Sequence, residues 1–153
     1  MLAAVSIPSL SQAAPQISYN PATGGIWMKN DTGASLSAFS VISAGNRVKT
    51  NPDLFTTIPG TIFDSGDLPL GFTYLNFPKT PADNSAGMFI GNVIAPGTPL
   101  ADLSGLYYIN FSNPGITIPG PPTLIPEPSS SLMACLAIMS LRAAASRAAV
   151  RRA

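Results

Sequence analysis

The sequence predicts an all-β fold, an antiparallel β-sandwich of about seven or eight short strands. Short apolar or alternating runs recur between residues 15 and 125, and clusters of Pro, Gly, Asn and Asp separate them. No stretch of this region keeps a helical period for three turns. Strands of this length with turn signals between them are typical of a sandwich, so we assign residues 14–119 to one β domain.

The individual strands are predicted from local patterns. Residues 17–19 and 26–29 are short apolar runs on either side of a Pro- and Gly-containing turn. Residues 36–43 alternate apolar and polar side chains over most of their length, which is the pattern of a half-buried strand. The later expected strands are 61–63, 71–77, 88–94 and 106–111.

The aromatic residues lie in or beside these strands, and most of them are expected in the core. An exposed ring at Trp27, Tyr107 or Tyr108 would instead offer a platform for stacking on carbohydrate. Because Tyr107 and Tyr108 are adjacent in a predicted strand, they point to opposite faces, and at most one of them faces the core.

The composition excludes several functional classes. The 153 residues include no histidine and one cysteine, and 10% are charged, against about 25% in ordinary soluble domains. Without histidine the chain has no Ser-His-Asp triad and no imidazole metal ligand, and one cysteine builds neither an internal disulfide nor a zinc cluster. A net charge of +1 argues against binding to nucleic acid. We expect no catalytic residues, no metal and no cofactor.

The two ends of the chain are predicted to be processing segments. Residues 1–13 are uncharged and rich in Ala, Ser and Leu, as in a signal peptide with cleavage at Ala13 or Ala14. This segment lacks a basic start, which indicates a late start codon or a weak signal. Residues 120–128 are Pro-rich and are expected to form an extended linker. Residues 129–153 contain an apolar run of helix formers, four arginines and no acid, and are expected to form a single helix with a basic tail.

Pro126, Glu127 and Pro128, followed by the apolar run and the arginines, resemble the PEP-CTERM sorting signal of exported bacterial proteins. The resemblance implies that an exosortase, a membrane-embedded cysteine-dependent enzyme, reads these three residues. It also implies a membrane anchor at Leu132, Leu136, Ile138 and Leu141, and cytoplasmic charges at Arg142, Arg147, Arg151 and Arg152. The β domain resembles, less specifically, exported β-sandwich domains of planctomycete type.

The expected function is therefore that of an exported, membrane-anchored or exosortase-processed protein of the cell surface or extracellular matrix. Its role would be structural, adhesive or associated with extracellular polysaccharide. It would lie in the inner membrane during sorting, and at the cell surface or outside the cell afterwards.

An alternative comes from two short motifs. The segments that begin at Asp31 (Asp-Thr-Gly) and Asp64 (Asp-Ser-Gly) resemble the catalytic turns of aspartic proteases, in which two carboxylates about 3 Å apart share a proton. The alternative function is a small aspartic-type hydrolase that uses Asp31 or Asp64. The same triplets are also ordinary turn sequences.

Overall fold

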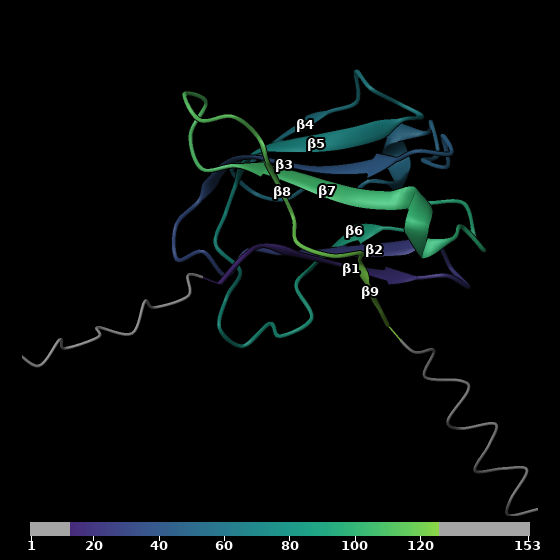
Figure 1. Ribbon diagram of the computed structural model, residues 1–153, viewed down its shortest axis with the longest axis horizontal. Helices are drawn as coiled ribbons and strands as arrows, with labels where there is room; N and C mark the ends of the chain where they lie inside the picture. The colour runs from purple at the N-terminus through teal and green to yellow at the C-terminus, as the bar shows by residue number, and fades with distance from the viewer. Residues whose placement is uncertain (1–12, 126–153) are drawn as a thin grey trace, which may run out of the picture.

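The computed structural model describes residues 13–125, which form two β-sheets that lie face to face and contain no α-helix (Figure 1). The four-stranded sheet has the order β6-β2-β1-β9, and the five-stranded sheet has the order β4-β5-β3-β7-β8. The strands are β1 (Gln16–Asn20), β2 (Gly25–Lys29), β3 (Leu36–Ser43), β4 (Ile62–Asp64), β5 (Gly71–Phe77), β6 (Met88–Gly91), β7 (Leu103–Tyr108), β8 (Ile116–Thr117) and β9 (Thr123–Leu124). Two single 3₁₀ turns, η1 (Pro52–Leu54) and η2 (Leu100–Asp102), lie in the loops.

The pairing within each sheet follows from the alternating sequence pattern and from tight turns. β1 and β2 form a hairpin in which the Asn20 side chain accepts hydrogen bonds from the N–H groups of Ala22 and Thr23. Gly24 in this turn has φ of 76°, a conformation that favours glycine. Every pair is antiparallel except β1 with β9, which run parallel. The predicted all-β class is confirmed, and β3 and β5 have the predicted bounds.

The core lies between the two sheets. Alternate residues of each strand point inward, as expected from the two-residue period of a strand. The largest fully buried side chains include Tyr19, Ile26 and Met28 of the four-stranded sheet and Phe39, Val41, Phe72 and Tyr74 of the five-stranded sheet. The Tyr74 hydroxyl donates a hydrogen bond to the Thr56 carbonyl at 2.7 Å, so the polar end of this buried ring is satisfied.

Two predicted strands differ from the structure by three residues at an end, whereas β1, β2 and β4 differ by one residue. β6 ends at Gly91 rather than at residue 94. Position 91 requires glycine, because its φ is 134° and a β-carbon there would collide with the Leu54 carbonyl. β7 runs from Leu103 to Tyr108 rather than over 106–111. Phe111, which looked like the end of the strand, is 70% exposed in the turn that follows.

The segment after β7 closes one side of the molecule. We call residues 116–124 the C-terminal strap, because they begin as β8 at the edge of the five-stranded sheet and end as β9 at the edge of the four-stranded sheet (Figure 1). The strap inserts Ile118, which is 7% exposed, into the core, and the Ile118 N–H donates a hydrogen bond to the Gly105 carbonyl at 3.0 Å. Part of the predicted linker is thus the edge strand β9.

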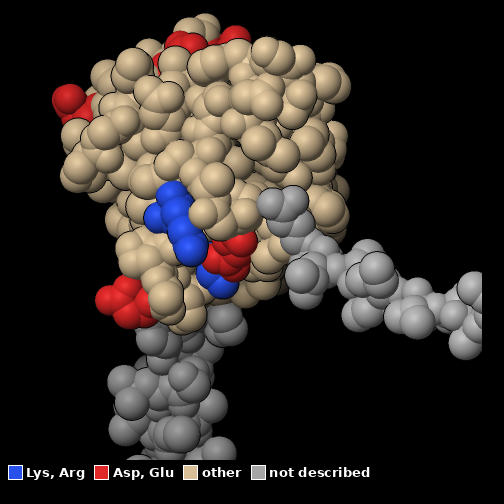
Figure 2. Space-filling view, turned by 90° about the vertical axis from the view of Figure 1, so that its left-hand side faces the viewer, with Lys and Arg blue, Asp and Glu red and all other residues tan. Residues whose placement is uncertain are grey.

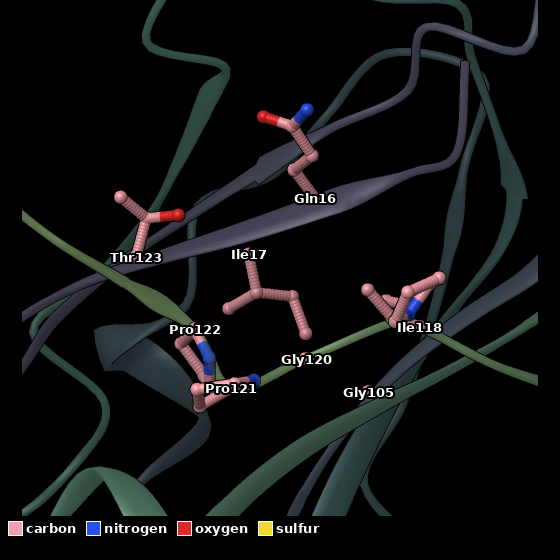
Figure 3. A pocket seen from close by; sticks show the side chains of 9 residues that line it. Gln16, Ile17, Gly105, Ile118, Gly120, Pro121, Pro122 and Thr123 are labelled. Carbon is pink, nitrogen blue, oxygen red and sulfur yellow. The ribbon is translucent and has the colours of Figure 1, made fainter.

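A small cavity of about 40 Å³ lies under the strap (Figure 3). Its lining includes Gln16, Ile17, Gly105, Ile118 and Pro121. A volume of this size has room for a water molecule but not for an organic ligand. We therefore regard it as a gap in the closure of the core and not as a ligand site.

Several predicted features lie outside the described residues. These are residues 1–12 of the predicted signal peptide, the motif Pro126, Glu127 and Pro128, and the whole predicted anchor and basic tail. Ala13 and Ala14 are described, and Ala13 is exposed. No helix within residues 13–125 is long and apolar enough to cross a membrane.

Candidate functional site

The outer face of the five-stranded sheet is hollowed. Strand register places Ile42, Ser40 and Ala38 of β3 beside residues of β5 and β7 that point the same way. We call the resulting depression of about 300 Å³ the sheet groove. Its lining side chains include Ala38, Ser40, Ile42, Asp67, Leu70, Thr73, Leu106 and Tyr108.

The floor of the sheet groove is made of small residues. Ala38 and Ser40 are only 5% and 9% exposed, although they point away from the core. Ser40 lies opposite Thr73 on β5, and the two hydroxyl oxygens are 2.7 Å apart, with either one as the donor. The result is a hydroxyl pair at the base of an otherwise mostly apolar depression.

Tyr108 supplies an aromatic wall. Its side chain is half-buried, and a β-carbon at Gly115 would lie 2.7 Å from its ring carbon Cζ and its hydroxyl oxygen, so Gly115 leaves room for the ring. Within residues 13–125 its hydroxyl makes no hydrogen bond. Its neighbour Tyr107 points to the other side and is 9% exposed in the core. The predicted opposite orientation is confirmed, but Tyr107 offers no exposed ring for stacking.

The charge at the sheet groove is negative. Asp67 is the charged residue among those that line it, and no hydrogen bond or ion pair engages its carboxylate within the described part of the chain. Asp64, on the next strand, lies opposite Thr73, and its carboxylate accepts a hydrogen bond from the Gly66 N–H at 2.9 Å. In the face shown in Figure 2, the basic side chains lie in the lower half together with acidic ones, whereas only acidic side chains lie at the upper edge, where the five-stranded sheet is. The groove is therefore suited to hydrogen-bond donors and unfavourable for anions.

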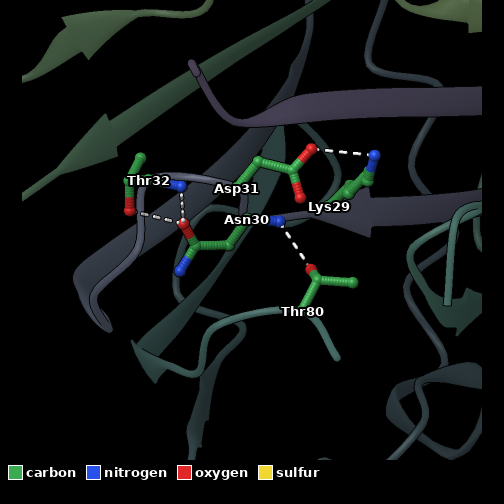
Figure 4. A network of polar contacts seen from close by, with 5 residues as sticks. All are labelled: Lys29, Asn30, Asp31, Thr32 and Thr80. Carbon is green, nitrogen blue, oxygen red and sulfur yellow. Dashed lines mark hydrogen bonds and ion pairs between the residues drawn. The ribbon is translucent and has the colours of Figure 1, made fainter. Parts of the chain in front are cut away.

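The Asp31 motif is a structural turn (Figure 4). The Asp31 carboxylate forms an ion pair with the Lys29 ammonium at 2.8 Å. Asn30 is fully buried, and its side-chain oxygen accepts hydrogen bonds from the N–H and the hydroxyl of Thr32. The Asn30 N–H donates to the Thr80 hydroxyl at 2.7 Å, which ties this turn to the loop after β5.

The contacts of Asp31 and Asp64 give no support to the aspartic-type alternative. That chemistry needs two carboxylates that share a proton. Asp31 is engaged by Lys29, and Asp64 by the N–H of its own turn. Over residues 13–125, no three carboxylate or thiol side chains form a group that could hold a metal ion.

Trp27 lies on the outer face of the other sheet. Its ring is half-buried and packs against Phe89, with ring centroids 4.8 Å apart. A β-carbon at Gly25 would lie 2.9 Å from the Trp27 ring, so the indole rests on the backbone of its own strand. Trp27 and Phe89 thus form a partly exposed aromatic pair away from the sheet groove.

Comparison with protein-family models, curated proteins and solved structures gives no match. The chemistry of the sheet groove follows from its own side chains. The sequence singled out Tyr108 as a residue for stacking, but no pattern in it marks Ser40 and Thr73 as a pair. Ser40 and Thr73 are 33 positions apart, and only strand register brings their hydroxyls together.

Proposed function

We propose that this protein is exported, is not an enzyme, and displays its β domain at the cell surface or in the extracellular matrix. The domain is either held by the C-terminal segment in the membrane or released there by an exosortase. Its role is structural, adhesive or associated with polysaccharide. In the finer fold that we propose, the two sheets form a sandwich that is followed by a Pro-rich linker and one C-terminal helix.

The observation that supports this proposal is the pairing of β1 with β9. β1 begins at Gln16, just after the proposed cleavage site at Ala13, and Pro15 between them is already buried. The Ile125 N–H, directly before the proposed sorting motif, donates a hydrogen bond to the Tyr19 carbonyl at 3.0 Å. The folded body therefore fills the interval between the two proposed processing segments.

The parallel direction of β1 and β9 is also compatible with a domain that is processed at both ends. β1 and β9 are neighbours and run parallel, so the chain enters β1 and leaves β9 at opposite ends of the four-stranded sheet (Figure 1). Cleavage after Ala13 would remove no strand residue, because Ala13 is exposed and precedes Gln16. An enzyme that reads the motif would act directly beside the edge strand β9 without entering the core.

The test is the mass of the mature protein in a host that carries an exosortase. We expect a wild-type N-terminus at Ala14, and a C-terminus or covalent modification near Pro126–Pro128. We expect Glu127→Ala to abolish the C-terminal change and to leave the protein in the membrane fraction. Asp83→Ala, which removes an exposed acid in a loop of the body, is the matched control and should be processed as wild type.

Two results would contradict the proposal. One is an intact Met1 on protein that stays in the cytoplasm. The other is an identical mass and location for wild type and Glu127→Ala in that host. The same proteins in a host without exosortase show which changes depend on the enzyme.

A further inference from the structure

We propose that the sheet groove binds a short stretch of a neutral polysaccharide, one or two sugar units at a time. This inference depends on the proposed function in one respect, namely that a protein outside the cell would encounter extracellular polysaccharide. The site itself is argued from the groove.

The size and shape of the sheet groove suit a small convex ligand. Its volume of about 300 Å³ lies at the lower limit of the range usual for pockets that bind small molecules. The recessed Ala38 and Ser40 form its floor, and the larger Leu106 and Tyr108 stand beside them. A second copy of this chain would present the same hollow, and two facing hollows leave a void between them, which favours a different occupant.

The lining combines the two kinds of contact that a sugar ring requires. A pyranose has apolar C–H faces and a rim of hydroxyl groups. The Tyr108 ring and the side chains of Ile42 and Leu106 offer apolar contact to the faces. The Ser40 and Thr73 hydroxyls, and the carboxylate of Asp67, offer hydrogen bonds to the rim. A wholly apolar ligand would cover the Asp67 carboxylate without offering it a hydrogen bond, at a cost in affinity.

The charge decides between classes of polysaccharide. Asp67 lines the sheet groove, Asp64 lies on the adjacent strand, and no Lys or Arg is present among the described lining residues. A uronate or sulfate group would be repelled by these carboxylates, whereas a sugar hydroxyl donates a hydrogen bond to Asp67. The ligand is therefore a neutral polymer.

The test is calorimetric titration of the purified full chain with three neutral oligosaccharides, namely cellohexaose, laminarihexaose and mannohexaose. An oligogalacturonate is the anionic comparator. The detergent must be zwitterionic, because a sugar headgroup would compete for the site. We expect at least one neutral oligosaccharide to bind and the oligogalacturonate not to bind.

The variants locate the site. Tyr108→Ala removes the aromatic wall and should weaken binding about tenfold. Asp67→Asn removes the charged acceptor and should weaken binding several-fold. The controls are Phe111→Ala, which removes an exposed ring outside the groove, and Asp83→Asn, which removes an exposed acid of another loop. Both controls should bind as wild type, and a thermal melt of each variant shows that it is folded.

Several results would overturn the inference. They are no binding of any neutral oligosaccharide at millimolar concentration, equal binding of the oligogalacturonate, and binding that Tyr108→Ala and Asp67→Asn leave unchanged. Sedimentation that shows a dimer dissociated by Tyr108→Ala would assign the groove to a second copy instead. The outcome is separate from that of the proposed function, because wild type and Glu127→Ala should bind sugar equally whether or not the chain is exported.

Discussion

Gly105 is the point at which the C-terminal strap meets the rest of the core. It lies on β7 and is buried, and its carbonyl accepts a hydrogen bond from the Ile118 N–H at 3.0 Å. A β-carbon at this position would collide with the Cδ1 atoms of both Ile17 and Ile118. Gly105→Ala should therefore destabilise the fold by overpacking, at a cost of about 1–3 kcal/mol.

The overpacking can be tested by removing one of the side-chain atoms with which the new methyl group would collide. Ile118→Val lacks Cδ1 and alone should cost about 0.5–1.5 kcal/mol through lost burial. In Gly105→Ala/Ile118→Val the methyl group at position 105 meets one Cδ1 instead of two. The double variant should thus be more stable than the sum of the single effects predicts, by about 0.5–1.5 kcal/mol. Alanine also lowers the conformational entropy of the unfolded chain relative to glycine. This effect is the same in Gly105→Ala and in the double variant, so it cancels in the comparison.

The assay is urea unfolding of the full chain, followed by the fluorescence of Trp27, the single tryptophan. Gly105→Ala/Ile90→Val is the matched control. Ile90 is fully buried but lies on β6, at the edge of the four-stranded sheet opposite β9, so these two effects should add. If Gly105→Ala and Ile118→Val also add, the strap does not pack on Gly105 as described. Equal stability of Gly105→Ala and wild type would refute the overpacking argument.

Two further predictions concern buried polar groups. Burial raises the pKa of Tyr74 from 10.0 to about 12, so in this pH range the native state keeps a proton that the unfolded state loses. Stability should therefore fall by roughly 2 kcal/mol as pH rises from 10 to 12. Urea unfolding should show this slope reduced in Tyr74→Phe, and parallel pH profiles of the two proteins would contradict it. Asn30→Ala removes the side chain that holds the turn after β2 and should cost about 2–4 kcal/mol. Asp31→Asn, which breaks only the partly exposed pair with Lys29, should stay within about 0.5 kcal/mol in the same assay, and a larger loss would mean that the ion pair and not Asn30 holds the turn.

The extent to which the strands were predictable depends on how regular their local patterns are. β3 alternates over most of its length, β5 is a run rich in aromatic and apolar residues, and both were located correctly, because one of their faces packs on the core. β7 was misplaced because Gly105 resembles a turn residue, whereas it is needed inside the strand to admit Ile17 and Ile118. β8 and β9 have two residues each, too few for any periodicity, and depend on the sheet edges that they join.

The candidate site was less predictable than the fold. Tyr108 was visible as an aromatic residue in a strand, but which of Tyr107 and Tyr108 faces outward is decided by the register of β7 on β3. Asp67 reaches the sheet groove from the loop before β5, and no local motif marks it. The Asp-Thr-Gly motif, by contrast, gave a strong local signal but is explained by its turn and the buried Asn30.

The position of the C-terminal strap in the chain sets the order in which the fold can be completed. A chain that emerges from its N-terminus has β1 to β7 available first, and β1 can already pair with β2. The space beside Ile17 and Gly105 stays open until Ile118 arrives, and β1 lacks one neighbour until Leu124 follows. The core of the domain therefore cannot close until the C-terminal strap is available, which makes the strap the last part of the fold to form.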